Sequence, residues 1–415
     1  MADVRRRDVG LAIRNLSHVV WNRAAKLWRQ IVRRGQRSRK QVRETSKALR
    51  ASARGSVDAG RDAASHAYVG TVRTARYWKR IHMQTTPRLL TELSVRRELR
   101  RVASGRGPII VGPWLSEVGY EVLYWVPFLR WYCDRYGVDP SRLVVVSRGG
   151  VASWYRDVAT QYIELLDLFD VPTFAARNAE RQRQGEQKQH AMADFDREIL
   201  SRVREQIGSQ HATVCHPSLM FRLLRQFWLG NESLQYVQEH TKYARVDLGD
   251  VPGVPVLPER FVAMKFYSGK AVPATDRNRE LLRALVERVA AESPVVTLDT
   301  GLAVDEHQDL LFDGIPGVMH LARHLTPQRN LGVQAAVIQR ASAYVGTCGG
   351  LAWLAPLLGT KTLAVYADDE LLAPHLYAAR QAYQAVDAAS FATLDVRAFD
   401  AVALPFHAGS STHAS

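Results

Sequence analysis

The chain has 415 residues, 47% of them apolar, and a formal net charge of +15. That length allows two or three domains, and no apolar run is long enough to span a bilayer. The basic start is followed by no compact apolar core, and the three cysteines are odd in number and far apart, which excludes an evident secretory signal and disulfide framework. We therefore expect a cytoplasmic protein.

The positive charge is concentrated in residues 1–106, which hold 27 Lys and Arg against 7 Asp and Glu. The remainder holds 29 against 34 and is mildly acidic. This asymmetry predicts a basic extension, residues 1–106, in front of a globular part.

Apolar residues recur in the extension at steps of three and four, as on one face of a helix: Val9, Ile13, Leu16, Val20, Ala24, Leu27 and Ile31. Arginines and lysines occupy much of the other face. The pattern favours a helix lying on the inner, anionic face of the cell membrane. Packing on the rest of the protein or on a second subunit is the alternative, and nucleic acid is the least favoured partner because no recognition motif is present.

Residues 107–246 alternate between predicted strands and helices, which is typical of a parallel sheet with helical crossovers. The expected strands are residues 108–113 and 142–150, and the expected helices are residues 117–136 and 156–168. Residues 180–190 are polar without apolar period and predict a solvated linker or loop, and residues 191–245 read as mostly helical.

Residues 247–260 contain four prolines and two glycines and are the predicted interdomain linker. The strand–helix alternation resumes in residues 261–400, and residues 401–415 are expected to be disordered. The expected strands are 260–267, 294–299, 317–322, 343–347 and 361–366, and the expected helices are 276–291 with Asp276 as N-cap, 326–341 and 349–359. The sequence thus predicts two Rossmann-like domains facing a cleft, where ligands of such folds bind.

The sharpest motif is YVGTCGGLAWLAPLLGTKTLAVY, residues 344–366. A strand ends at Gly346-Thr347, a tight turn follows at Gly349-Gly350, and a helix begins at once. Glycines there let the backbone approach a ligand, and the first N–H groups of a helix attract phosphate. The alternative is that the glycines only permit a sharp turn and close packing of the helix.

This motif resembles the C-terminal signature of the heptosyltransferase-like glycosyltransferases of the GT-B fold. Gly350-Leu351-Ala352 and Leu354-Ala355 match the family pattern in register. The family's Asp, Thr and His are replaced by Cys348, Gly349 and Trp353. The resemblance spans about residues 107–390 and does not extend to residues 1–106.

A second patch, VGPWLSEVGYEVLYWVPFLR (residues 111–130), resembles the start of the same family. There Gly-Asp follows the first strand and Pro comes six residues later; here Glu121 precedes Pro127 by six residues, and Tyr120 is inserted after Gly119. The resemblance implies that Glu121, or else Glu117, is the base that takes the acceptor's proton in an inverting transfer. The alternative is that both are carboxylates stabilised by a helix start.

The resemblance also implies a nucleotide site in the second domain. Its expected residues are Lys265, Lys270, Thr347, Cys348, Gly349 and Gly350, with Arg277 as a further candidate; the alternative for the lysines is that they are plain surface groups. Arg148 and Trp154 follow the second strand and are expected on the acceptor side, with a solvated loop as the alternative. Asp305, Glu306 and His307 are adjacent on a predicted loop, where side chains point apart, so we expect neither a metal site nor a cofactor beyond the donor.

The sequence thus indicates a metal-independent glycosyltransferase that moves a sugar from a nucleotide donor to a glycan or lipid-linked acceptor, as in polysaccharide biosynthesis. One rival is a GT-B-like binding or assembly protein without catalysis, which the replaced Asp and His favour. The other is a nucleic-acid-associated protein whose basic arm carries the function.

Overall fold

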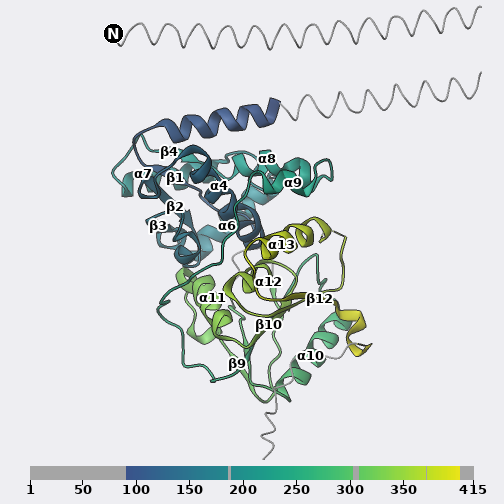
Figure 1. The fold of residues 1–415 in the computed structure, drawn as a ribbon. Coiled ribbons are helices and arrows are strands. Elements are labelled where there is room, and N and C mark those ends of the chain that lie inside the picture. The colour runs from purple at the N-terminus through teal and green to yellow at the C-terminus, as the bar shows by residue number, and fades with distance from the viewer. Residues whose placement is uncertain (1–89, 186–187, 302–307, 371, 402–415) are drawn as a thin grey trace, which may run out of the picture. The chain divides into compact units, whose positions relative to one another are not determined.

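The computed structural model describes residues 90–185, 188–301, 308–370 and 372–401 (Figure 1). The described residues all belong to one compact unit. The predicted extension up to residue 89, the Asp305–His307 run and the tail from residue 402 lie outside the described residues. Among those described, no helix is long and apolar enough to cross a bilayer.

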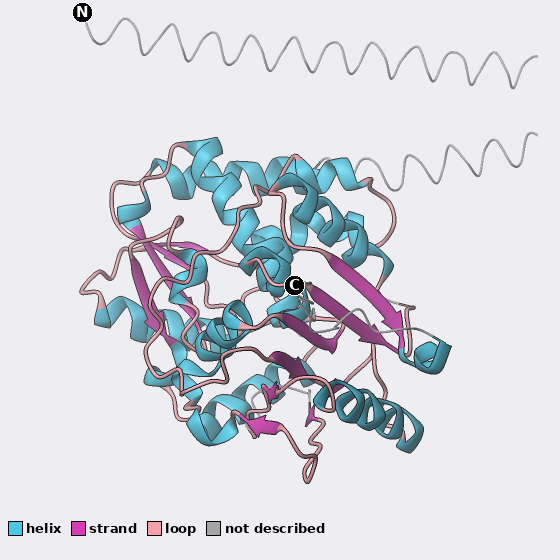
Figure 2. Cartoon of the chain, turned by 60° about the horizontal axis from the view of Figure 1, so that its bottom comes forward, coloured by secondary structure: helices cyan, strands magenta, loops and turns pink. Residues whose placement is uncertain are grey.

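The fold is α/β with two separate parallel sheets, as predicted (Figure 2). The first has the order β3-β2-β1-β4 and the second the order β12-β11-β10-β5-β7-β9. Their strands are β1 (Ile109–Val111), β2 (Leu143–Ser147), β3 (Gln161–Glu164) and β4 (Thr213–Cys215), then β5 (Val262–Lys265), β7 (Val295–Thr297), β9 (Val318–His320), β10 (Ala343–Thr347), β11 (Thr362–Tyr366) and β12 (Phe391–Asp395). A short antiparallel pair joins β6 (Tyr267–Ser268) to β8 (Gln308–Asp309).

Helices flank both sheets. In the first half these are residues 90–104, α3 (Val118–Tyr120), the π-helix η1 (Glu121–Trp125), α4 (Val126–Tyr136), α5 (Leu165–Leu168), α6 (Val171–Arg183), α7 (Asp194–Gln206), α8 (Ser218–Trp228) and α9 (Leu234–Gln238). In the second they are α10 (Asp276–Ala290), α11 (Asn330–Arg340), α12 (Gly350–Leu354) and α13 (Ala373–Ala385). The 3-10 turns are η2 (Pro140–Arg142), η3 (Ala152–Tyr155), η4 (Ala322–His324), η5 (Pro327–Arg329), η6 (Ala355–Leu358) and η7 (Val396–Ala401).

The strands bury alternate side chains on opposite faces, as the pleat of a sheet requires. On the first sheet Ile110 packs with Phe174 of α6 and Phe195 of α7, whereas Ile109 belongs to the larger core that contains residues of α4 and α8. On the second sheet, Val262 packs with residues of α10. The larger core runs through both halves, so the halves share one continuous apolar interior.

The helix of residues 90–104 is part of this interior. Val95, Leu99 and Val102 are buried in the same core cluster as Ile109. The last turns of the basic segment therefore help to hold the first sheet together.

Four expectations of secondary structure were wrong in detail. Residues 161–164 form strand β3 and not part of a helix, because they pair with β2 and complete the edge of the sheet. The three residues of β4 were missed inside the segment read as helical, and the N-cap of α10 is Thr275, whose hydroxyl accepts the Asn278 N–H. Residues 180–190 are not a solvated loop throughout, since α6 extends to Arg183 and Gln189 is fully buried.

Candidate active site

The two glutamates that follow β1 occupy opposite environments. Glu117 precedes α3 in extended backbone, and 48% of its side chain is exposed. Glu121 opens the π-helix η1 and has no exposed surface. Glu117 lies just before the helix and Glu121 lies within it, so the two side chains do not share a helix face although they are four residues apart.

The π-helix lies where the sequence carries one residue more than the family pattern it resembles. A π-helix closes hydrogen bonds over five residues and so absorbs one extra residue within an otherwise α-helical segment. Residues 118–136 are accordingly helical from α3 through η1 to α4, as predicted. Glu121 points into the first half.

Glu121 is held by hydroxyl groups. Its Oε1 accepts hydrogen bonds from Ser147 Oγ at 2.6 Å and from the Tyr155 hydroxyl at 2.5 Å. Its Oε2 has no hydrogen-bond partner in the structure. Burial raises the pKa of Glu121 to about 7, against the opposing effects of these two hydrogen bonds and of Arg148.

Glu117 belongs to a polar cluster that draws on both halves. Its Oε1 lies 2.6 Å from Lys188 Nζ, and that ammonium group lies 3.7 Å from the centre of the Tyr120 ring. The Tyr120 and Tyr124 hydroxyls lie 3.4 and 2.9 Å from the two ring nitrogens of His375, on α13. Burial, and then the charge of Lys188, lower the pKa of His375 to about 4, so the ring is neutral at pH 7.

The start of α12 packs directly on the start of α3. A β-carbon on Gly350 would lie 2.9 Å from the Val118 β-carbon, and one on Gly119 would lie 3.2 Å from the Trp353 ring. One on Gly349 would overlap the Tyr267 hydroxyl. The structure thus brings together the two patches singled out in the sequence, and these contacts alone account for the glycines.

The remaining predicted nucleotide residues differ in accessibility. Thr347 is buried, and its hydroxyl accepts the Tyr267 N–H; Cys348 is buried as well, which raises its pKa to about 12. Lys265 is 12% exposed, lies 2.9 Å from Asp309 Oδ1 and donates to the Leu298 carbonyl. Lys270 is exposed, as is Arg277.

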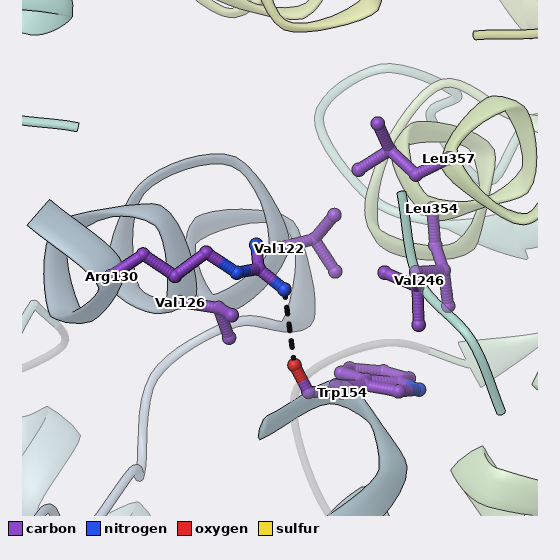
Figure 3. Close-up of a pocket in the computed structure, with 7 residues that line it drawn as sticks. All are labelled: Val122, Val126, Arg130, Trp154, Val246, Leu354 and Leu357. Atoms are coloured by element: carbon purple, nitrogen blue, oxygen red, sulfur yellow. Dashed lines mark hydrogen bonds between the residues drawn. The ribbon is translucent and has the colours of Figure 1, made fainter. Parts of the chain in front are cut away.

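Arg148 and Trp154, the predicted acceptor-side residues, are both buried. Arg148 donates to the carbonyls of Trp114 and Ser116 in the loop between β1 and α3. Trp154 lines a pocket between the halves with Val122, Val126, Arg130, Val246, Leu354 and Leu357 (Figure 3). This pocket has room for about one water molecule. It is a packing gap, and its one charged residue is paired with Asp157.

Two further buried side chains hold the β1–α3 loop. Gln189 accepts the Leu115 N–H and donates to the Pro113 carbonyl and to Asp196, while Arg181 donates to the Leu115 carbonyl. Together with Arg148 they form the loop clamp: Arg148, Arg181 and Gln189. The sequence analysis did not predict Lys188, Gln189 or His375; the first two lie in the polar run of residues 180–190, and His375 lies on α13.

Within the described residues, no three His, Cys, Asp or Glu side chains are placed to share a metal ion.

Comparison with known proteins gives remote matches of fold. No protein-family model matches the chain, and the search of curated proteins gave no match. Among solved structures, the chain is similar to the dodecameric iron-containing glycosyltransferase TibC of enterotoxigenic E. coli, with 12% identity and a TM-score of 0.35, over 62% of this chain and 59% of that one. It is also similar to a family 9 glycosyltransferase of Veillonella parvula, with 13% identity, a TM-score of 0.39 and coverage of 72% and 89%.

The E. coli heptosyltransferase WaaC, whose structure contains ADP, matches with 14% identity and a TM-score of 0.38 over 71% of this chain and 98% of that one. The recognised resemblance to heptosyltransferase-like GT-B proteins thus recurs among the solved structures. At these TM-scores, any assignment of function must come from the site itself.

Proposed function

We propose that the protein is a glycosyltransferase that moves a sugar from a nucleotide donor to a hydroxyl group of a glycan or lipid-linked acceptor, with Glu117 as the general base. The observation that carries this proposal is the contact between two segments that are far apart in the sequence, since Val118 and Gly350 are separated by 232 residues. An exposed carboxylate at the carboxyl end of β1 lies beside the glycine-rich helix start that follows β10.

The chemistry needs few groups. The acceptor oxygen forms a bond to the anomeric carbon as the bond from that carbon to the donor phosphate breaks, and the nucleoside diphosphate leaves with the electron pair. Glu117 takes the proton of the attacking hydroxyl. A base opposite the leaving group corresponds to inversion at the anomeric carbon.

Glu117 is preferred to Glu121 on grounds of access. A base must come within hydrogen-bond reach of the hydroxyl that it deprotonates, and Glu121 has no exposed surface. Its two hydroxyl partners come from the first half itself, so we assign Glu121 a role in holding η1 against β2.

The proposal is tested by incubating the full chain with labelled ADP-, GDP-, UDP- and CDP-sugars and measuring sugar transfer and release of nucleoside diphosphate. We expect one donor class to be consumed and Glu117→Gln to lower the rate by about a hundred- to ten-thousand-fold. Glu98→Gln is the matched control, because Glu98 is a partly exposed carboxylate paired with Arg222 elsewhere. A comparable loss only in Glu121→Gln would make Glu121 the base.

A second candidate is a binding or assembly protein that has kept the fold without catalysis. The direct packing of Gly350 on Val118 favours it, since no space for a substrate separates these segments. Saturable nucleotide binding without turnover of any of the four donors would select this candidate.

A further inference from the structure

The ammonium group of Lys188 lies at the centre of the Glu117 cluster. It is 2.6 Å from the Glu117 carboxylate and lies over the Tyr120 ring, and it is close enough to His375 on α13 to lower the pKa of that residue. These groups come from the segment before η1 and from α13, one in each half of the molecule. A cation between the two halves, beside the general base, is well placed for an anionic part of the donor.

The backbone on which Lys188 stands is fixed by the next residue. Gln189 is fully buried, and its amide bonds to Leu115, Pro113 and Asp196. The adjacent side chains point in different directions, so one anchors the segment in the core while the other reaches the surface. The Lys188 side chain is 27% exposed, so its long stem can turn while its α-carbon stays in place.

Lys265, which the sequence suggested for this role, is less available. It is paired with Asp309, donates to the Leu298 carbonyl, and both members of the pair are largely buried. Breaking such a pair leaves a carboxylate without its partner in a desolvated place, which is costly. The Lys188–Glu117 pair is more exposed, and exposed pairs contribute little free energy, so a multiply charged anion can displace the carboxylate.

We propose that Lys188 binds the diphosphate of the nucleotide donor by exchanging its ion pair with Glu117 for phosphate oxygens, so that donor binding frees Glu117 to accept the proton. This inference rests on the proposed function and adds an order of events to it. Before the donor binds, Lys188 is ion-paired with Glu117, the proposed base. After the donor binds, Lys188 instead neutralises negative charge on the leaving diphosphate.

The exchange predicts opposite effects on affinity for the two members of the pair. Calorimetry on the full chain with ADP, GDP, UDP, CDP and inorganic pyrophosphate should show that Lys188→Met weakens diphosphate binding by about ten- to a hundredfold, because a charge-assisted hydrogen bond is lost. Lys188→Arg should retain most of the affinity. Glu117→Gln should tighten binding by up to about fivefold, because the competing carboxylate is gone. In the double variant with Lys188→Met this gain should vanish.

The pair formed by Lys242 and Asp134 supplies the controls. It is an exposed lysine–carboxylate pair near the end of α4, so Lys242→Met and Asp134→Asn make the same charge changes away from the cluster. Both should leave diphosphate affinity unchanged. If Lys242→Met weakened diphosphate binding as much as Lys188→Met, the loss of affinity would reflect only the net charge of the protein, and the proposal would be overturned.

Other outcomes also overturn it. These are no diphosphate binding by the wild-type chain, unchanged affinity in Lys188→Met, weaker binding in Glu117→Gln, or binding of pyrophosphate with no nucleoside diphosphate bound more tightly. The proposed function can fail independently of the exchange. If the variants show the expected affinities but no donor supports sugar transfer, the transferase function alone is rejected. Transfer that depends on Glu117 but not on Lys188 would reject the exchange alone.

Discussion

The loop between β1 and α3 and the loop between β10 and α12 each follow the carboxyl end of a parallel strand, but they are built differently. The first follows β1 with Gly112-Pro113-Trp114-Leu115-Ser116 and is held by the buried side chains of the loop clamp. The second is shorter, and hydrogen bonds between Thr347 and Tyr267 hold its beginning. The first leads to a cluster of titratable side chains, whereas the second ends in two glycines.

This difference separates two tasks. A proton acceptor must be positioned within hydrogen-bond reach, and buried side chains that bind its supporting backbone achieve this. A segment that offers only backbone must instead be free of side chains, and Gly349 and Gly350 meet that condition. Under the proposed function, the first loop would carry the proton acceptor and the second would allow close approach of its backbone.

The largest effect on stability is expected at the clamp. Gln189→Leu keeps the volume but leaves the Leu115 N–H and the Pro113 carbonyl without partners in the interior. Each unsatisfied group costs about 1–3 kcal/mol, so we expect the free energy of unfolding to fall by about 3 kcal/mol in urea denaturation. The exposed Gln184 is the control, and Gln184→Leu should stay within about 0.5 kcal/mol of wild type. Equal, small effects would show that the clamp does not hold the loop.

Glu121 gives the next largest effect on stability, and the size of that effect depends on pH. The pKa of the buried carboxyl is about 7, raised from 4.5 by burial, so the folded protein binds this proton more tightly than the unfolded chain. The free energy of unfolding therefore falls as pH rises between those two values, by about 3 kcal/mol at most.

Glu121→Gln keeps an oxygen for Ser147 and Tyr155 and carries no charge. We expect the variant to be the more stable protein at pH 8 and to lose that advantage near pH 4.5, as followed by thermal unfolding across this range. Parallel curves for the two proteins would mean that Glu121 is not the buried acid described above.

A smaller loss is expected in the glycine-built loop. Gly350→Ala places a β-carbon 2.9 Å from that of Val118, so α12 must shift, which costs about 1–3 kcal/mol in unfolding free energy. Gly107→Ala is the control, since a β-carbon there meets nothing within 4 Å. If nucleotide affinity falls in Gly350→Ala in step with stability, the contact itself matters to the site; if stability is unchanged, the two helix starts are not in contact.

The sequence predicted those features of the two loops that depend on neighbouring residues, and missed those that depend on contacts between residues far apart in the sequence. Gly349-Gly350 and Glu117 stand in local patterns of strand, turn and helix, so both loops were found and both sheets expected. The burial of Glu121 depends on Ser147 and Tyr155, which lie 26 and 34 residues away, and no local pattern encodes that. The loop clamp was not predicted for the same reason, because Gln189 bonds to Leu115, 74 residues earlier, from a polar run that is typical of a loop. Strand β4 is three residues long, too short for a period, and exists because it pairs with β1.

The basic extension is expected to matter least to either loop, and this allows its role to be isolated. Truncation at Gly107 would remove Val95, Leu99 and Val102 from the core and destabilise the fold. A loss of lipid binding in that variant could then result from unfolding and not from the missing extension. A chain beginning at Arg88, the boundary of the compact unit, avoids this, and we expect its free energy of unfolding to stay within about 0.5 kcal/mol of the full chain.

If the extension binds anionic lipid, only the full chain should sediment with vesicles that contain acidic phospholipid. Less of it should sediment as salt shortens the screening length from about 10 Å at 0.1 M to 3 Å at 1 M. Equal sedimentation of the two chains would place the lipid contact within residues 88–415 and leave residues 1–87 to the alternatives, a subunit contact or nucleic acid.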